Sequence, residues 1–315
     1  MLNECKMVFK KPSALISISG DLTCRGKKLF SMLCFAAYCI LQKNENISTF
    51  ELPIPLIKDL CDFNKSLGSG DIDAKIEKSH RATKGSLHGI LKLLVDTSIE
   101  YNIFGKDGNE WGYFSPVAFV AIKNGIVTFC FPQPILKILS KLYPVPYATI
   151  DLMVIRELKH IHNITYYEFL KDYKNIKTPW ISANNYRRLL GYNTRGNITY
   201  ISNIIHNVER NIDELEEKAG VIVTHKVEKV NGIITQIRII PNWIKMKQDY
   251  NFKRDELMTK LDAFINNHYV KDVKSAVKRV EKSIDIGNIM KDVDGILVSN
   301  GLEEIILRRQ QIMDE

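Results

Sequence analysis

The feature that most constrains this chain is an order of elements that occurs twice: helical patterns followed by a hairpin with Asn-Gly at its turn. Asn124-Gly125 and Asn231-Gly232 each separate two apolar, strand-like runs. Asn-Gly between such runs is a strong hairpin signal, because both central residues of a type I′ turn need positive φ. Helices followed by a hairpin are the layout of a winged helix. The repetition therefore predicts two related domains rather than one large one.

The first copy is expected over residues 1–143. Apolar residues recur at helical spacing over residues 22–41, 56–60 and 87–95. Strands are expected over residues 49–54, 98–104, 111–122 and 126–131. Pro144 and Pro146 cannot continue a helix, because each lacks an N–H and restricts the residue before it. We place the domain boundary there.

The second copy is expected over residues 144–244. Helical patterns cover residues 150–161, 164–173 and 183–190, and a longer one covers residues 198–219. Ser182 is the expected N-cap of the third helix and Gly191 its C′ residue. A short strand over residues 179–181 and a hairpin over residues 221–240 complete the copy. We expect residues 245–315 to form a helical extension, to which no role is assigned. The predicted fold class is α+β, mainly helical, with tandem winged-helix domains.

The charge of the chain favours an anionic partner. It carries 44 Lys and Arg against 36 Asp and Glu, a net charge of +8, and its pI is about 9.0. Residues 245–315 hold equal numbers of acidic and basic residues, so the whole excess lies in residues 1–244. Clustered Lys and Arg gain free energy by releasing counterions from a polyphosphate. We therefore expect double-stranded DNA as the partner.

Other classes of protein are disfavoured by missing motifs. The six cysteines form no C-x-x-C pair and have no His at zinc-ligand spacing, so no metal site is expected and a reduced cytoplasm is the simplest location. The apolar run 29–41 falls short of the roughly 18 residues that a membrane span needs. No G-x-x-x-x-G-K-[ST] motif occurs. We expect no membrane association, no enzyme activity and no cofactor.

The candidate DNA-reading element is the long helix of the second domain, expected to begin near residue 197. In a winged helix such a helix enters the major groove, and the hairpin reaches phosphates beside it. Its polar side carries residues that can pair with base edges, namely Thr199, Tyr200, Ser202, Asn203, His206, Asn207 and Arg210. Phosphate contacts are expected from its neighbours Arg187, Arg188, Arg195, Lys226 and Lys229. The equivalent cluster of the first domain is Lys78, Arg81 and Lys84.

A family resemblance supports this interpretation. Residues 166–173 read YYEFLKDY, Trp180 follows, and residues 186–191 read YRRLLG. This resembles the replication initiators of iteron-type plasmids, which have a helix ending in Leu-Tyr-Glu-Leu-Leu-Lys, a short aromatic strand and a Leu-Arg-x-Leu-Leu-Gly helix. The similarity covers residues from about 15 to 240. One departure is that Tyr200-Ile201-Ser202-Asn203 stands where the family often has a Phe-Lys-Arg-like stretch.

The resemblance implies a first domain that mediates homodimerisation and makes auxiliary DNA contacts, and a second domain that reads direct repeats at an origin. It also implies opening of nearby AT-rich DNA, recruitment of the host replication initiator and replicative helicase, and repression of the initiator's own promoter by dimers.

Two alternatives remain. A rolling-circle nicking enzyme would hold a metal with His160 and His162 and attack DNA with Tyr166 or Tyr167. The two His, however, lie in a helical pattern, whereas ligands two residues apart share a face only on a strand. A plain winged-helix repressor differs from an initiator only in the events after binding.

Overall fold

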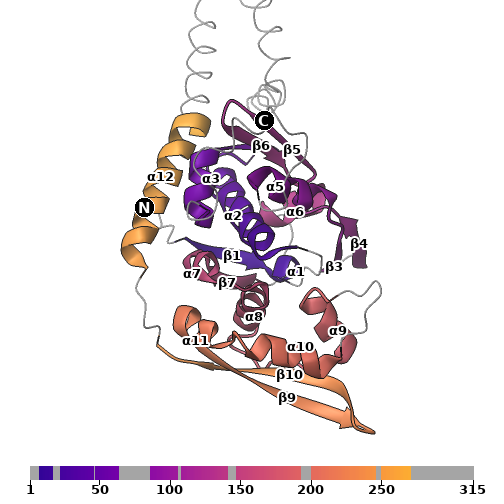
Figure 1. The fold of residues 1–315 in the computed structure, drawn as a ribbon. Helices are drawn as coiled ribbons and strands as arrows, with labels where there is room; N and C mark the ends of the chain where they lie inside the picture. Colours follow the sequence, from indigo (N-terminus) through magenta and orange to yellow (C-terminus); the bar gives the residue numbers. More distant parts are fainter. Residues whose placement is uncertain are drawn as a thin grey trace, which may run out of the picture. The chain divides into compact units, whose positions relative to one another are not determined.

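The computed structural model describes residues 7–16, 22–45, 47–63, 86–105, 108–140, 147–192, 200–245 and 250–270. The chain splits into two compact units, residues 1–263 and residues 264–315. Figure 1 shows the described helices and strands as a ribbon. The first unit contains both winged helices. The described part of the second comprises the end of α12 and a short π-helix, η1 (Asn266–Val270).

The first winged helix is built around α2 (Cys24–Leu41), whose side chains are buried almost throughout. Its other elements are, in chain order, β2 (Thr49–Pro53), α3 (Ile54–Cys61), α5 (Leu87–Asp96), β5 (Phe119–Lys123) and β6 (Ile126–Cys130). The sheet has the order β2-β6-β5. An added hairpin, β3 (Ile99–Gly105) with β4 (Gly108–Phe114), precedes β5, and α6 (Gln133–Leu139) follows β6.

The second winged helix repeats this topology. Its elements are α8 (Ile161–Asp172), β8 (Ile181–Ser182), α9 (Ala183–Leu189), α10 (Ile201–Glu209), α11 (Asp213–Ala219), β9 (Val221–Val230) and β10 (Ile233–Trp243). The sheet order is β8-β10-β9. In both halves the third strand therefore lies between the first and the second, which confirms the predicted α+β fold with tandem winged helices.

Both hairpins close as the sequence predicts. Asn124 and Gly125 have φ of 52° and 74°, and Asn231 and Gly232 have φ of 51° and 78°. These values are those of a type I′ turn, whose twist matches that of the flanking strands. The caps of α9 are also as predicted: the Ser182 hydroxyl accepts from the Asn185 amide at 3.3 Å, and Gly191 has a φ of 75°.

Several predicted elements are wrong in extent. The expected helix over residues 150–161 begins as a strand, β7 (Tyr147–Asp151), and α7 (Leu152–Glu157) follows it. The expected helix over residues 198–219 is two helices, α10 and α11. Residues 98–122 hold three strands rather than two, and the short strand expected over residues 179–181 is β8.

The two halves are joined by a sheet that sequence reasoning missed. Strand β1 (Val8–Pro12), from the start of the chain, pairs antiparallel with β7 of the second half. Beside it, the Lys11 ammonium lies 2.5 Å from Glu168 Oε1, and the Lys27 ammonium lies 3.4 Å from Glu168 Oε2. Lys11 and Glu168 are completely buried. The predicted boundary at residues 143–144 thus separates segments that share a sheet and a buried ion cluster.

Helix α12 (Asn251–Ile265) begins the predicted C-terminal extension and contacts both halves. Arg254 pairs with Asp151 of β7 at 2.7 Å, and Lys260 pairs with Asp59 of α3 at 2.9 Å. Among the described helices, none is long and apolar enough to cross a membrane.

Candidate nucleic-acid interface

Helix α10 has one buried face and one polar, exposed face. Ile201, Ile204, Ile205 and Val208 are buried, and this spacing follows the helical period. The exposed positions are Ser202, Asn203, His206, Asn207, Glu209 and Arg210, the last directly after the helix, and Tyr200 at its N-cap is 71% exposed. The apolar face packs the helix onto the domain, so the amide, hydroxyl and imidazole groups are presented outward together.

The basic neighbours predicted around this helix come from two further elements. Arg187 and Arg188 lie in the last turn of α9, which contacts α10, and Arg188 is exposed. Lys226 and Lys229 are exposed on β9, in the wing. Together these elements would supply the positive charge that α10 itself lacks.

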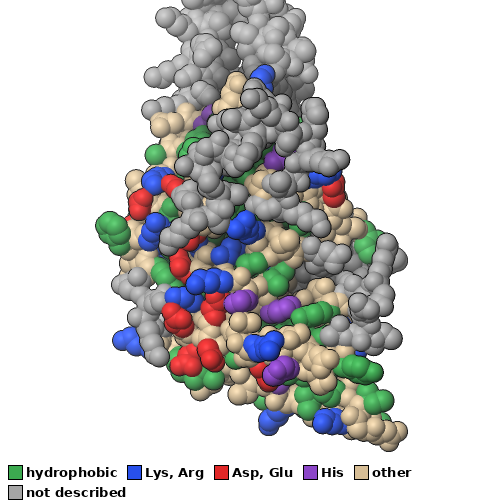
Figure 2. Space-filling model, in the orientation of Figure 1, with side chains coloured by type: hydrophobic (Ala, Val, Ile, Leu, Met, Phe, Trp, Pro, Cys, Tyr) green, Lys and Arg blue, Asp and Glu red, His purple; other side chains and the backbone are tan. Residues whose placement is uncertain are grey.

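The wing also exposes apolar side chains. Val230 and Ile233, which flank the Asn-Gly turn, are 58% and 70% exposed. Figure 2 shows basic and hydrophobic side chains side by side over the β9–β10 hairpin. The predicted site residues Thr199, Arg195, Lys78, Arg81 and Lys84 lie outside the described residues.

The break between α10 and α11 limits the candidate interface to α10. In α11, Asp213, Glu214 and Glu216 occupy the first turn, where carboxylates stabilise a helix N-terminus. The Asn163 amide donates to the Asn211 carbonyl at 2.8 Å and to Glu214 at 2.7 Å, which holds the break in place. Sequence reasoning missed this break, although the acidic run is a helix-start signal that could have revealed it.

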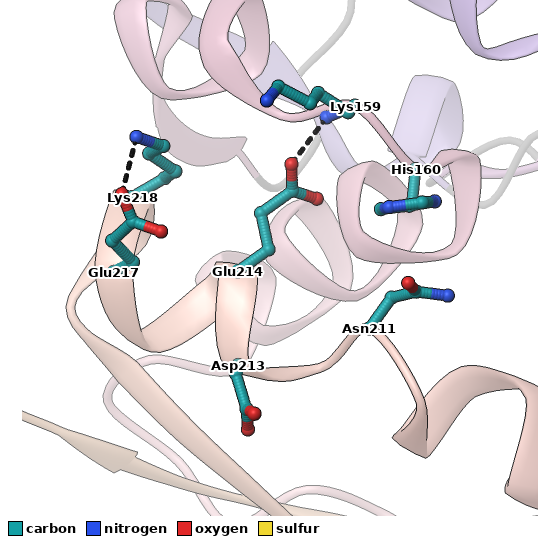
Figure 3. A pocket seen from close by; sticks show the side chains of 7 residues that line it. All are labelled: Lys159, His160, Asn211, Asp213, Glu214, Glu217 and Lys218. Carbon is teal, nitrogen blue, oxygen red and sulfur yellow. Dashed lines mark hydrogen bonds and ion pairs between the residues drawn. The ribbon is translucent and has the colours of Figure 1, made fainter.

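An open pocket of about 300 Å³ lies beside this break (Figure 3). It is lined by Lys159, His160, Asn211, Asp213, Glu214, Glu217 and Lys218. Glu214 accepts from the Lys159 amide at 2.7 Å, and Lys218 pairs with Glu217 at 2.7 Å. Three carboxylates line the pocket, so it does not suit a phosphate backbone.

The two tyrosines of the nicking alternative are buried, and one of its histidines is paired with another tyrosine. Tyr166 is 0% exposed and Tyr167 is 1% exposed, and burial raises the pKa of both phenols. His162 lies in α8, where its Nε2 is 3.2 Å from the Tyr192 hydroxyl, and burial lowers its pKa. Within the described part of the chain, no group of three or more His, Cys, Asp or Glu could hold a metal ion.

Tyr166 instead belongs to a hydrogen-bond network, running from the core to the surface, that was not predicted from the sequence. Its hydroxyl bonds to the Tyr186 hydroxyl and lies 2.8 Å from His225 Nε2. His225 Nδ1 lies 3.2 Å from Glu209 Oε1. The four side chains come from α8, α9, β9 and α10. We call them the Tyr-His network.

Residues 8–171 match the family described as Initiator Replication protein, WH1. A crystal structure of domains 2 and 3 of RctB is similar, with 12% identity, a TM-score of 0.37, and coverage of 70% of this chain and 83% of that one. No curated protein matches the sequence.

The family match spans the first winged helix together with α7 and nearly all of α8. It covers just over half of the 315 residues. The chain therefore belongs to this family of plasmid replication initiators, which are DNA-binding winged-helix proteins.

Proposed function

We propose that this protein initiates plasmid replication by binding repeated origin sequences through α10 and the β9–β10 wing. The observation that carries the proposal is the division of α10 into a wholly apolar buried face and an exposed face of Ser202, Asn203, His206 and Asn207. Asn can form two hydrogen bonds with adenine, and Ser can bond either a base edge or a phosphate.

Phosphate anchoring is assigned to the neighbours of α10. Base-edge contacts specify a sequence, whereas contacts to phosphates position the protein and supply much of the affinity. Arg187 and Arg188 of α9 and Lys226 and Lys229 of the wing bracket α10 along the chain. In this proposal these four side chains bind DNA phosphates while α10 contacts base edges in the major groove.

The remaining steps are proposed from the family. The first winged helix would mediate homodimerisation and make auxiliary DNA contacts. Binding to tandem repeats would open neighbouring AT-rich DNA and recruit the host replication initiator and replicative helicase. Dimers would repress the gene's own promoter.

The test has two stages. Selection of binding sites from a random duplex pool, followed by footprinting on the DNA that flanks the gene, should give direct repeats spaced by about two helical turns. A lone inverted repeat would instead indicate a plain repressor. Affinity for the selected site should fall by orders of magnitude between roughly 50 and 200 mM salt if several phosphates are neutralised. If affinity does not change with salt concentration, the proposed phosphate contacts are contradicted.

A further inference from the structure

The Tyr-His network has one consistent direction of hydrogen bonding. The Glu209 carboxylate only accepts, so the neutral His225 ring donates to it from Nδ1 and accepts at Nε2. Tyr166 therefore donates to His225 Nε2, and its oxygen accepts from the Tyr186 hydroxyl. Burial lowers the pKa of His225, although Glu209 opposes this, and burial raises the pKa of both phenols, so these protonation states are the stable ones near neutral pH.

The network connects α10 to the wing with directional contacts. The apolar face of Ile201, Ile204, Ile205 and Val208 also attaches α10, but apolar contacts tolerate sliding and rotation. Just beyond the helix, the Asn163 amide holds the Asn211 carbonyl. The bond from His225 to Glu209 fixes the C-terminal end of α10 to β9. The Tyr166 hydroxyl, which bonds to the other ring nitrogen, fixes the orientation of the His225 ring. The His225 side chain is 4% exposed, whereas that of Glu209 is 50% exposed, so the chain of bonds runs from the core to the surface.

We propose that His225 and Tyr166 are positioning residues that set the alignment of α10 against the wing, so that sequence discrimination depends on them. This inference rests on the proposed function of α10. Hydrogen bonds to base edges weaken steeply when the donor angle or distance changes. The attraction between Lys or Arg and a phosphate varies slowly with distance. A small displacement of α10 therefore weakens specific binding more than general affinity for DNA.

The test compares Tyr166→Phe and His225→Leu with the wild-type protein. Dissociation constants are measured for the selected duplex and for an unrelated duplex, at temperatures where thermal melting shows that each variant is folded. The ratio of the dissociation constant for unrelated DNA to that for the selected duplex should fall by roughly tenfold, which is the scale of one lost hydrogen bond. The constant for unrelated DNA and its salt slope should stay unchanged. His225→Gln, which can still reach Tyr166, should restore part of the ratio.

Tyr167→Phe is the matched control. Tyr167 is the next residue of α8 and equally buried, but its hydroxyl accepts from the Asp151 amide at 3.1 Å, outside the network. Its loss should leave the ratio unchanged. Glu209→Ala, at the exposed end of the network, provides a second variant if Tyr166→Phe does not fold, and it should also lower the ratio.

The outcomes separate the two proposals. Equal effects of Tyr166→Phe and Tyr167→Phe would overturn the positioning role, because a general loss of packing would then explain both. If Asn203→Ala relaxes discrimination while Tyr166→Phe, His225→Leu and Glu209→Ala do not, the positioning role alone is refuted. If Asn203→Ala and its neighbouring substitutions also leave discrimination unchanged, the recognition surface lies off α10 and both proposals fail.

Discussion

Asn203 and Arg188 are predicted to contribute to DNA binding in different ways. Asn203 is exposed in the first turn of α10, and its replacement by Ala should cost roughly 1–3 kcal/mol if the amide pairs with one base. The preference for one base over the others should weaken at a single position of the DNA site. Arg188→Ala should instead weaken binding to all sequences and lower the salt slope by about one.

Competition binding against single-base variants of the selected site measures both effects. If Asn203→Ala, Ser202→Ala and Thr199→Ala all leave the ranking of variants unchanged, discrimination lies elsewhere. The Lys78 to Lys84 cluster of the first half would then be the next candidate.

Glu168 is the second residue with a sharp prediction, and it concerns stability. Its single carboxylate pairs with the ammonium groups of both Lys11 and Lys27 in a buried position. Removing one partner of a buried ion pair leaves an uncompensated charge and costs roughly 3–5 kcal/mol. Glu168→Ala should therefore lower the free energy of unfolding by that amount in urea titrations. Lys92→Ala is the control, because its pair with Asp96 is on the surface and should matter by less than about 1 kcal/mol.

The same carboxylate has a defined pH dependence. Burial acts to raise the pKa of Glu168, but Lys11 and Lys27 outweigh it and the pKa is lowered. A lowered folded pKa means that this stabilisation is fully present above the ordinary Glu pKa and is lost as the pH falls through the folded value. The difference in stability between the wild type and Glu168→Ala should therefore shrink in acid and stay constant near neutral pH.

At the level of elements, the sequence correctly predicts the turns, caps and helices that are determined by neighbouring residues. The Asn-Gly turns, the cap at Ser182 and the apolar spacing of α2 and α5 depend on neighbouring residues, and all are found where predicted. Strand β7 was missed because its partner β1 is more than 130 residues away in the chain. Its alternation of exposed and buried positions was obscured by the continuous apolar run of α7.

The two glycines of the Asn-Gly turns allow a matched test of the wing. A Cβ at Gly232 or Gly125 would meet nothing within 4 Å, so a substitution affects only the backbone, which has positive φ at both sites. Gly232→Val and Gly125→Val should each cost roughly 1–2 kcal/mol of stability. Only Gly232→Val should weaken DNA binding, because only that turn supports Lys226 and Lys229. Similar losses of affinity in the two variants would argue against a distinct role for the second wing.

At the level of the whole molecule, the sequence predicted the class of partner better than the coupling of the halves. The basic excess of residues 1–244 and the polar face of α10 are readable from composition and spacing. The Tyr-His network and the Lys11–Glu168–Lys27 cluster are not, because each joins residues that are brought together only by the fold. Lys27, for example, lies in a basic stretch that precedes an apolar run. No neighbouring residue in the sequence indicates that it pairs with Glu168 of α8.

The contacts between the two halves predict that they unfold cooperatively. Strand β1 completes a sheet with β7, Lys11 neutralises Glu168, and Arg254 of α12 pairs with Asp151. If the second half unfolded alone, it would withdraw Glu168 from two buried ammonium groups, and if the first half unfolded alone, Glu168 would be left buried without them. Either partial state carries the penalty of an unpaired buried charge. Both halves should therefore lose amide protection at the same urea concentration when hydrogen exchange is followed segment by segment. In Glu168→Ala combined with Lys11→Ala, the link is weakened and the two losses should separate. Separate transitions in the wild-type protein would show instead that the halves fold independently on either side of residues 143–144.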